Sequence, residues 1–259
     1  MADGCLLRLL QSTFMPVQQS EAIVLGSTPL READLVVTLF TRSDGKLRGV
    51  AKSALKSKKR FGGALEPLTV VTAHWEARNH DLMRLDSCEV LHSPLTDTVD
   101  YTRAVALGHV AESLNQLLPD HEANDAVFRL ALATLQNLRV GSIWMPLTYF
   151  DLWMTRLTGL LPEMHLCRKC GTTLNGSAAW FHPLSEGLMC KQHKRLASIE
   201  MSAESRALAA EMLKAPITQF TGAPWPRSRC AELRRFLHQR MEGQMEKKLM
   251  SAATLEKLE

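Results

Sequence analysis

The sequence predicts an α+β protein, with a small β-barrel first, a helical domain after it and a cysteine-rich segment inserted in the helical part. β-branched and alternating apolar residues fill the first hundred positions, and after Pro94 the apolar residues recur at helical spacing. Three of the six cysteines lie within residues 167–190. A content of 46% hydrophobic and 22% charged residues among 259 is typical of a folded globular chain. The sequence contains no apolar run of about 18 residues, the length that a membrane-spanning helix needs.

Five strand-like segments occupy the first hundred residues, at 22–25, 35–41, 47–52, 68–75 and 83–91. Turn residues separate most of them, and the Asp44-Gly45 pair is a strong hairpin signal. Five short antiparallel strands in so few residues predict a small barrel, for which the five-stranded OB-fold is the best candidate. An SH3-like barrel stays open as an alternative, because the pattern alone does not separate the two.

Five apolar stripes at helical spacing follow the barrel. They cover residues 107–118, 127–138, 147–161, 208–213 and 229 to about 250. Pro119 ends the first stripe, and Ser202 with Ser205 opens the fourth helix. Each stripe predicts a helix face that is buried in a core.

These patterns divide the chain into five parts. They are a flexible N-terminal extension (1–18), a barrel domain (19–98), a first helical part (99–166), a metal-binding insertion (167–195) and a second helical part (196–259). The extension does not look like a signal peptide, because Asp3 precedes a short apolar run. Without an export signal, we expect reduced cysteines and a cytoplasmic protein.

A concentrated basic segment runs from Arg42 to Arg60. Its 19 residues hold eight basic residues and one acid, giving +7, whereas the whole chain is only +4. A solvated lysine-rich loop is the plain interpretation. In an OB barrel, however, this segment covers strand 3 and the connection after it, on the surface that such barrels use for single strands. We therefore predict a DNA-binding surface made of Arg42, Lys46, Arg48, Lys52, Lys56, Lys58, Lys59 and Arg60.

The expected surface has two parts. Lys46, Arg48 and Lys52 share one face of a strand, and residues 56–60 form a mobile cluster that closes over the phosphate backbone. Phe61 and Trp75 are the only aromatic residues near, and both are also core candidates. We therefore expect binding driven by phosphates, tolerant of sequence and strongly dependent on salt.

A metal site is predicted by Cys167-x2-Cys170, nineteen intervening residues and Cys190-x2-His193. Two closely spaced ligand pairs joined by a loop are how a tetrahedral Zn²⁺ site is assembled. Gly171 and Gly187 suit the turns that direct each pair at one ion. His165 and His182 stay open as substitutes for His193. Four protein ligands leave no open coordination position, so the expected zinc is structural.

No sequence pattern indicates an enzyme. The chain has no Gly-x4-Gly-Lys-Ser/Thr phosphate loop, no His-Glu-x2-His and no Gly-x-Ser-x-Gly. No carboxylate cluster for two Mg²⁺ ions lies near the basic segment, which disfavours a nuclease. A zinc-stabilised RNA-binding or transcription factor remains the main alternative to a DNA-binding protein, and a pure scaffold would leave the +7 segment unexplained.

Two runs make the chain resemble a known family: Gly-Lys-Leu-Arg-Gly-Val-Ala-Lys at 45–52 and Arg-Phe-Gly-Gly-Ala-Leu-Glu-Pro at 60–67. Followed by a helical domain with a Cys-x2-Cys-Gly knuckle, they resemble the RecO family of bacterial DNA-repair proteins, recombination mediators of the RecF pathway. The resemblance covers about residues 20–245. Two residues depart from it: Ser53 stands where the family usually has glycine, and His193 where zinc-bearing members commonly have cysteine.

The resemblance implies a non-enzymatic mediator. Such proteins bind single-stranded and double-stranded DNA, anneal complementary strands, pair with RecR, contact the acidic C-terminal tail of single-strand-binding protein and help to load RecA. It implies a cytoplasmic location, with the nucleoid as the site of action during repair, and a tail pocket in the helical domain. Arg234, Arg235 and Arg240 beside Phe236 are one candidate for that pocket.

Overall fold

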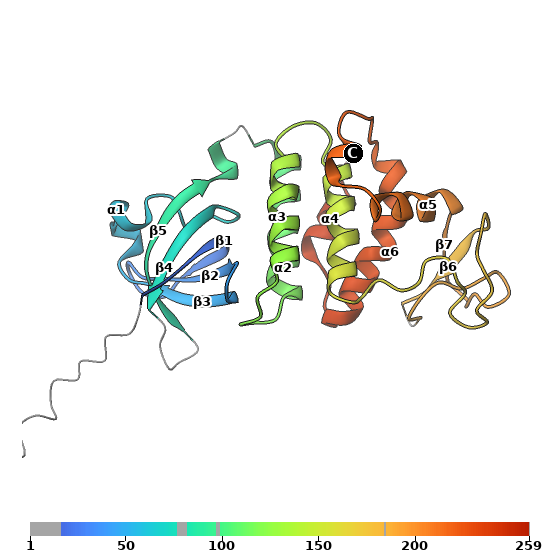
Figure 1. Cartoon of the computed structure of the whole chain (residues 1–259), viewed down its shortest axis with the longest axis horizontal. Coiled ribbons are helices and arrows are strands. Elements are labelled where there is room, and N and C mark those ends of the chain that lie inside the picture. Colours follow the sequence, from blue (N-terminus) through green and yellow to red (C-terminus); the bar gives the residue numbers. More distant parts are fainter. Residues whose placement is uncertain (1–16, 77–81, 97–98, 184, 259) are drawn as a thin grey trace, which may run out of the picture. The chain divides into compact units, whose positions relative to one another are not determined.

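The computed structural model describes residues 17–76, 82–96, 99–183 and 185–258 (Figure 1). They form two compact units. The first contains the described residues up to Thr41 together with those of Leu47–His92. The second contains the short turn Arg42–Lys46 and the described residues from Ser93 onward.

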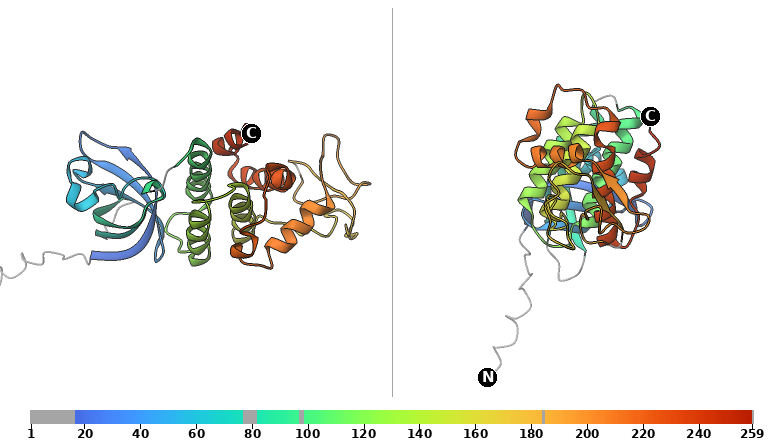
Figure 2. Two further views of the ribbon diagram at one scale, coloured as in Figure 1. Left: turned by 90° about the horizontal axis from the view of Figure 1, so that it is seen from above. Right: turned by 90° about the vertical axis from the view of Figure 1, so that its right-hand side faces the viewer.

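The first unit is a closed five-stranded barrel, whose strands curve around a common interior in the left view of Figure 2. The strands are β1 (Val17–Pro29), β2 (Leu35–Thr41), β3 (Gly45–Ala51), β4 (Val70–Glu76) and β5 (Met83–His92), in the order β1-β2-β3-β5-β4. β1 pairs with β4 through residues 17–23 and with β2 through residues 22–29, and the register shift between Val24 and Gly26 lets one strand serve both neighbours. This architecture confirms the predicted OB-type barrel.

The expectation of purely antiparallel strands was wrong at one pair. β3 and β5 run parallel, with Gly49 opposite Met83 and Ala51 opposite Leu85. The chain leaves β3 through a 3-10 turn, η1 (Ala54–Lys56), and a short helix, α1 (Lys58–Phe61), before β4 begins. After β4 the chain turns back, so that β5 lies beside β3 and runs in the same direction as β3. Parallel neighbours need such a long connection, because a tight turn can join only antiparallel strands.

The barrel core accounts for both aromatic residues near the basic segment. Trp75 is 2% exposed and Phe61 is 3% exposed, and both belong to the apolar cluster inside the barrel. The predicted start of the barrel needs a correction as well. Val17 and Gln18 already pair with Glu76 and Trp75, so the barrel begins at residue 17 and not 19, because these residues complete the β1–β4 ladder. The rest of the predicted extension, residues 1–16, lies outside the described residues.

The second unit is helical. Its helices are α2 (Tyr101–Leu117), α3 (Asp125–Asn137), α4 (Trp144–Leu157), α5 (Ala203–Met212), α6 (Arg227–Met245) and α7 (Met250–Leu255). One face of the second predicted stripe is buried, as expected, and consists of Val127, Leu130, Ala131, Leu135 and Leu138. The Ser202 side chain caps α5 by accepting a hydrogen bond from Ser205 N–H. Two turns, η2 (Pro94–Thr96) and η3 (Ile217–Phe220), and a small sheet, β6 (Ala179–Phe181) with β7 (Ile199–Met201), complete the unit.

Two expectations for the helices were wrong in detail. The buried face of α2 includes the polar residues His109 and Ser113, whereas Leu107 is only half-buried. The fifth predicted helix stops at Met245, because Glu246 adopts a left-handed conformation (φ 52°) and ends the hydrogen-bond ladder. No described helix is long and apolar enough to cross a bilayer.

Candidate nucleic-acid interface and metal centre

The side chains of β3 alternate between the barrel interior and solvent. Gly45, Leu47, Gly49 and Ala51 are buried, whereas Arg48 is exposed and Lys46 and Val50 are half-buried. This confirms the predicted shared face for positions 46, 48 and 50, but the strand ends at Ala51, so the prediction that Lys52 lies on the same strand face was wrong. Lys52 is exposed in the turn that follows the strand.

The segment after β3 is folded into short helices, so the expected mobile loop was wrong. Ala54 of η1 and Phe61 of α1 are buried in the barrel core and fix the segment at both ends. Arg60 donates hydrogen bonds to Lys52 O (2.7 Å) and Ser57 Oγ (3.1 Å), and its guanidinium lies over the Phe61 ring. Arg60 therefore holds the segment together, while Lys58 and Lys59 before it are exposed.

Ser53 shows why glycine suits the position before η1. Its φ of 54° is in the left-handed region, where a side chain is strained and glycine is not. The Ser53 N–H donates to Asp34 Oδ1 at 2.8 Å, which helps to hold this conformation. The turn thus keeps its shape although the residue departs from the family pattern.

The predicted basic residues separate into two groups. Arg42 and Lys46 belong to the second unit, where Arg42 Nε lies 2.6 Å from Asp125 Oδ1 and Lys46 Nζ lies 3.1 Å from Asp120 Oδ1. Lys46 also donates to Asn115 O, and its side chain is only 13% exposed. These two cations already have acidic partners within the protein.

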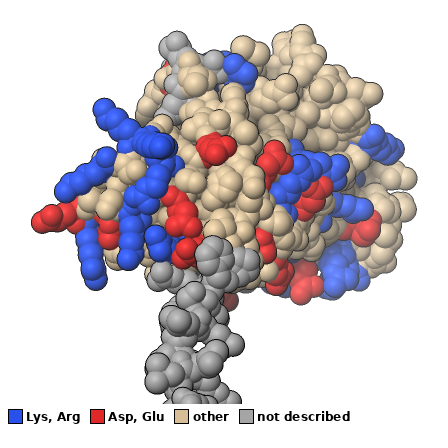
Figure 3. Space-filling view, turned by 60° about the vertical axis from the view of Figure 1, so that its left-hand side comes forward, with Lys and Arg blue, Asp and Glu red and all other residues tan. Residues whose placement is uncertain are grey.

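The other six basic residues gather on the barrel. Lysine and arginine side chains stand out together from the face that is brought forward in Figure 3. All but the half-buried Arg60 are exposed. We call this set the cationic face; it consists of Arg48, Lys52, Lys56, Lys58, Lys59 and Arg60.

The structure brings the four predicted metal ligands together. The ligand atoms of Cys167, Cys170, Cys190 and His193 all lie within 4.8 Å of one another. His193 Nδ1 is 3.3 Å from Cys190 Sγ and 3.8 Å from Cys167 Sγ, and the Cys170 and Cys190 sulfurs are 4.0 Å apart. Three sulfurs and one imidazole nitrogen in this arrangement can hold a metal ion such as zinc.

The same geometry identifies the fourth ligand of the cluster. His193 completes the cluster, whereas His165 is exposed and its Nδ1 lies 3.2 Å from Glu163 Oε2. Gly171 has a φ of 70° and makes the turn expected of it. Gly187 does not adopt a left-handed conformation, and a Cβ built on it would make only ordinary contacts with Pro162 (3.4 Å) and Arg168 (3.5 Å), so the structure gives no reason for a glycine there.

Backbone hydrogen bonds prepare one ligand to be charged. Burial raises the pKa of the Cys167 thiol, but hydrogen bonds from the backbone N–H groups of Cys190, Cys170 and Lys169 outweigh this and bring the pKa to about 6. The thiolate is the form that ligates metals. This turn therefore favours the ligating form near neutral pH.

Arg206 on α5 supports the loop between the two ligand pairs, and no sequence signal distinguished it. Its side chain is buried and donates to Leu174 O (2.6 Å), to Met164 O (3.3 Å) and to Ser177 O. Burial lowers the pKa of this guanidinium. α5 is thus tied to the metal-binding insertion by one desolvated cation.

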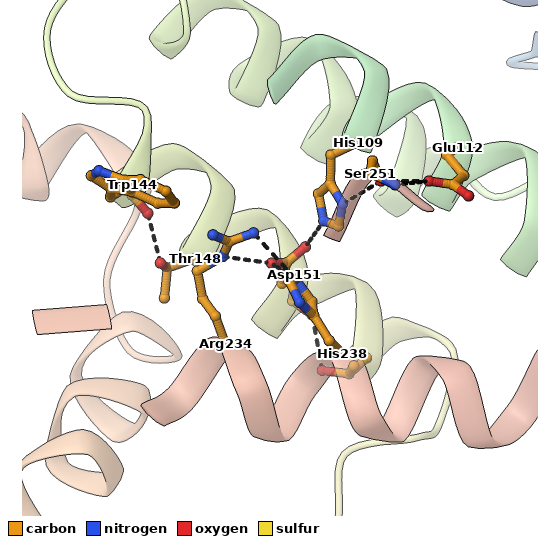
Figure 4. Close-up of polar contacts among 9 residues, drawn as sticks. His109, Glu112, Trp144, Thr148, Asp151, Arg234, His238 and Ser251 are labelled. Atoms are coloured by element: carbon orange, nitrogen blue, oxygen red, sulfur yellow. Dashed lines mark hydrogen bonds and ion pairs between the residues drawn. The ribbon is translucent and has the colours of Figure 1, made fainter. Parts of the chain in front are cut away.

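A buried polar network around Asp151 was also missed (Figure 4). The Asp151 carboxylate lies 2.7 Å from His109 Nε2, 3.0 Å from His238 Nε2 and 3.1 Å from Arg234 Nε. Burial raises the pKa of Asp151, but the charges of these three partners hold it well below its usual range. For His238, in contrast, burial disfavours the charged imidazolium and lowers the pKa.

The network joins the helices to one another. His109 Nδ1 lies 3.0 Å from Ser251 Oγ, and Glu112 accepts a hydrogen bond from Ser251 N–H, so α2 holds the start of α7 (Figure 4). His109, Asp151 and His238 are close enough to share an ion, but the Arg234 guanidinium already occupies the same carboxylate. These groups hold the helices together.

The candidate tail pocket was wrong in placing Phe236 and Arg240 in it, whereas Arg234 and Arg235 do line one cavity of the helical unit. Phe236 is 1% exposed and packs against Phe181 in the core. Arg234 is committed to Asp151, and Arg240 donates to Leu160 O and Ser185 O. Positions 234 and 240 therefore face different partners, and only Arg235 of the three is exposed.

Comparison with known proteins agrees with this geometry. The family model described as "Recombination protein O N terminal" matches residues 15–94, and "Recombination protein O C terminal" matches residues 99–253. The chain belongs to the RecO family. RecO proteins are non-enzymatic recombination mediators, so the prediction of a non-enzymatic DNA repair and recombination protein is confirmed, and membership implies DNA and RecF-pathway partners.

Individual relatives are similar over much of the chain. The DNA repair protein RecO of Koribacter versatilis (strain Ellin345) is 60% identical over 244 residues, which cover 94% of this chain and 100% of the relative. RecO of Anaeromyxobacter sp. (strain K) is 35% identical over 65% of this chain and 67% of its own length. RecO of Syntrophotalea carbinolica is 31% identical over 78% of this chain and 80% of its own length.

Proposed function

We propose that this RecO protein binds single-stranded and double-stranded DNA through the cationic face, anneals complementary strands, and with RecR helps to load RecA onto strands coated by single-strand-binding protein. The observation that carries the proposal is the presentation of Lys52, Lys56, Lys58 and Lys59 as exposed side chains on a segment anchored in the barrel core. The cytoplasm, and the nucleoid during repair, are the proposed places of action.

The chemistry of the cationic face favours phosphates over bases. Each lysine or arginine that neutralises a phosphate releases condensed counterions, which makes binding depend steeply on salt. Phe61 and Trp75 are buried in the barrel, so neither is available as a base-stacking platform. The bound DNA is therefore expected to be recognised by charge, with little sequence preference.

Annealing follows from the same charge. Two complementary strands repel each other through their phosphates, and a cationic surface lowers this repulsion where it holds one strand or both. No nucleotide and no metal-assisted chemistry is needed for this step. Pairing with RecR and loading of RecA are proposed from family membership.

The acidic tail of single-strand-binding protein is a further proposed partner. A cavity of about 250 Å³ in the helical unit is lined by Arg227, Arg234 and Arg235 together with Trp144, Leu255 and other residues. Arginines beside apolar walls suit a peptide that carries both acidic and apolar side chains. We propose this cavity, in place of the Phe236 site, for the tail.

We further propose that Cys167, Cys170, Cys190 and His193 hold a structural Zn²⁺. Zn–S bonds of about 2.3 Å and Zn–N bonds of about 2.0 Å in a tetrahedron separate the ligand atoms by roughly 3.5–3.8 Å. The observed separations of 3.3, 3.8 and 4.0 Å fit this requirement. When bound, the ion would tie two distant turns of the insertion to each other.

Strand annealing tests the proposed function. Two complementary labelled DNA strands are mixed with the protein in the presence of a chelator and without nucleotide, and duplex formation is followed by energy transfer. The expected result is annealing well above the spontaneous rate. Metal-dependent cleavage, or binding that prefers RNA strongly without annealing DNA, contradicts the proposal.

A further inference from the structure

The four side chains of the metal cluster differ in their exposure to solvent. Cys167 is 1% exposed, Cys190 and His193 are half-buried, and Cys170 is exposed. The Cys170 sulfur lies 4.0 Å from the Cys190 sulfur. Both sulfurs would be thiolate ligands when zinc is bound, and an exposed cysteine sulfur with a second cysteine sulfur beside it has the arrangement of a reactive cysteine and its resolving partner.

We propose that Cys170 is an oxidation site for small hydroperoxides, and that a disulfide between Cys170 and Cys190 then releases the metal. The proposal rests on the zinc ion proposed above. It assigns the three cysteines of the cluster different roles: Cys170 and Cys190, one from each pair, take part in the reaction, and the buried Cys167 does not.

The reaction balances with hydrogen peroxide as the oxidant. The Cys170 thiolate attacks a peroxide oxygen, an S–O bond forms, and the O–O bond breaks to give hydroxide, which takes up a proton to become water. The Cys190 thiolate then attacks the sulfur of this sulfenic acid, an S–S bond forms, and the S–O bond breaks with loss of hydroxide, which takes up a proton to become a second water. The two thiolates lose two electrons and the peroxide gains them.

The geometry favours this pair. An S–S bond of about 2.05 Å requires the two sulfurs to approach by roughly 2 Å, and Cys170 is on a turn at the protein surface. Cys88 and Cys230, which lie outside the metal cluster, are buried. Burial raises the pKa of both thiols, that of Cys88 to about 12. Among the described cysteines, only Cys170 offers an exposed sulfur.

Loss of the metal would reach α5 through Arg206. Leu174 and Ser177, whose carbonyl oxygens accept hydrogen bonds from Arg206, lie on the loop between Cys170 and Cys190. If that loop moves, the buried guanidinium of Arg206 loses two of its three hydrogen-bond acceptors, which destabilises the folded state. We therefore expect oxidation to raise amide hydrogen exchange in α5 as well as in the insertion.

The experiment uses the full-length, zinc-loaded protein and hydrogen peroxide. Zinc release is followed with a chromogenic chelator, and the product is digested with trypsin. Cleavage after Arg168, Lys169 and Lys191 leaves Cys170 and Cys190 in one peptide, 170–191, whereas Cys167 falls in peptide 157–168.

The expected result is stoichiometric zinc release with a 170–191 peptide that is lighter by two hydrogens, reversed by dithiothreitol and added zinc. Zinc that stays bound in excess peroxide overturns the proposal, and so does a cross-link between peptides 157–168 and 170–191. Untreated protein that contains no zinc overturns this proposal and the zinc proposal together, so the two failures are distinguishable.

Variants sharpen the assignment. Cys170→His keeps four nitrogen and sulfur ligands but removes the exposed thiol, so its zinc release should slow about tenfold or more. Cys230→Ala, which removes a buried thiol, should release zinc at the wild-type rate. Release from C170H at the wild-type rate overturns the proposal.

Dimedone labelling of the wild-type protein gives a measurement that needs no variant: an adduct on Cys170 supports the proposal, and an adduct on Cys167 or Cys190 instead contradicts it.

Discussion

Removal of three lysines from the cationic face tests how the proposed DNA contact works. Lys56, Lys58 and Lys59 are exposed on η1 and α1, and the segment is held by Ala54, Phe61 and Arg60. The triple variant K56Q/K58Q/K59Q therefore removes three charges without removing an anchor. Arg60 is left intact because its hydrogen bonds stabilise the segment.

The magnitude follows from counterion release. Each lost phosphate contact should flatten the slope of log K against log salt by about 0.7 on single-stranded DNA, so three contacts give a change of about 2. If all three lysines contact phosphates and the two proteins bind equally at 1 M salt, the variant should bind roughly a hundredfold more weakly than the wild-type protein at 0.1 M salt.

Fluorescence anisotropy with a labelled oligonucleotide, measured across a salt series, gives both quantities. The matched control is R195Q/K247Q/K257Q, which removes the same charge from exposed positions of the second unit. A control that weakens binding and flattens the slope as much as the triple variant does would mean that only net charge matters. An unchanged slope in the triple variant would refute the contact itself.

Four further predictions concern the metal centre and the fold. Cys167→Ser should lose the bound zinc, and metal analysis that finds equal zinc in variant and wild type rejects the site. Asp151→Asn replaces the carboxylate shared by His109, His238 and Arg234 with a neutral amide that has one acceptor oxygen, and should lower the free energy of unfolding by about 3–5 kcal/mol in denaturant titrations; a change below 1 kcal/mol rejects the network as a stabilising element. The pKa of His238 is lower in the fold than in the unfolded chain, and that of Asp151 is also lowered, so in both cases the unfolded chain binds more protons. Wild-type stability should therefore fall as pH drops through about 6.5 and again below about 4, and a profile that is flat over this range contradicts the assignment. Ser53→Gly relieves a left-handed serine and should raise stability by about 0.5–1 kcal/mol, measured by thermal melting, and a clear loss contradicts the account of this turn.

Local patterns in the sequence were sufficient for much of the fold. The alternation along 35–41 predicted β2 at its observed bounds, and Ser202 marked the start of α5. The Cys-x2-Cys and Cys-x2-His spacing identified all four residues of the metal cluster, because the ligands within each pair are close along the chain.

Features that depend on tertiary packing were not predictable. The parallel β3–β5 pair arises from a crossover, and alternation has the same period in parallel and antiparallel strands. His109, Asp151 and Arg234 lie far apart in sequence and on helix faces that otherwise look apolar, so no local pattern links them. Charge alone also did not show that Lys46 is paired with Asp120, since that partner lies 74 residues away.

Annealing of strands that are already coated with single-strand-binding protein tests the central claim most directly. The wild-type protein and the K56Q/K58Q/K59Q variant are compared in one assay, at one salt concentration and without nucleotide. The account predicts that the wild-type protein anneals the coated strands and that the variant does so much more slowly. Coated strands that stay separate with the wild-type protein, or equal rates for the two proteins, would contradict it.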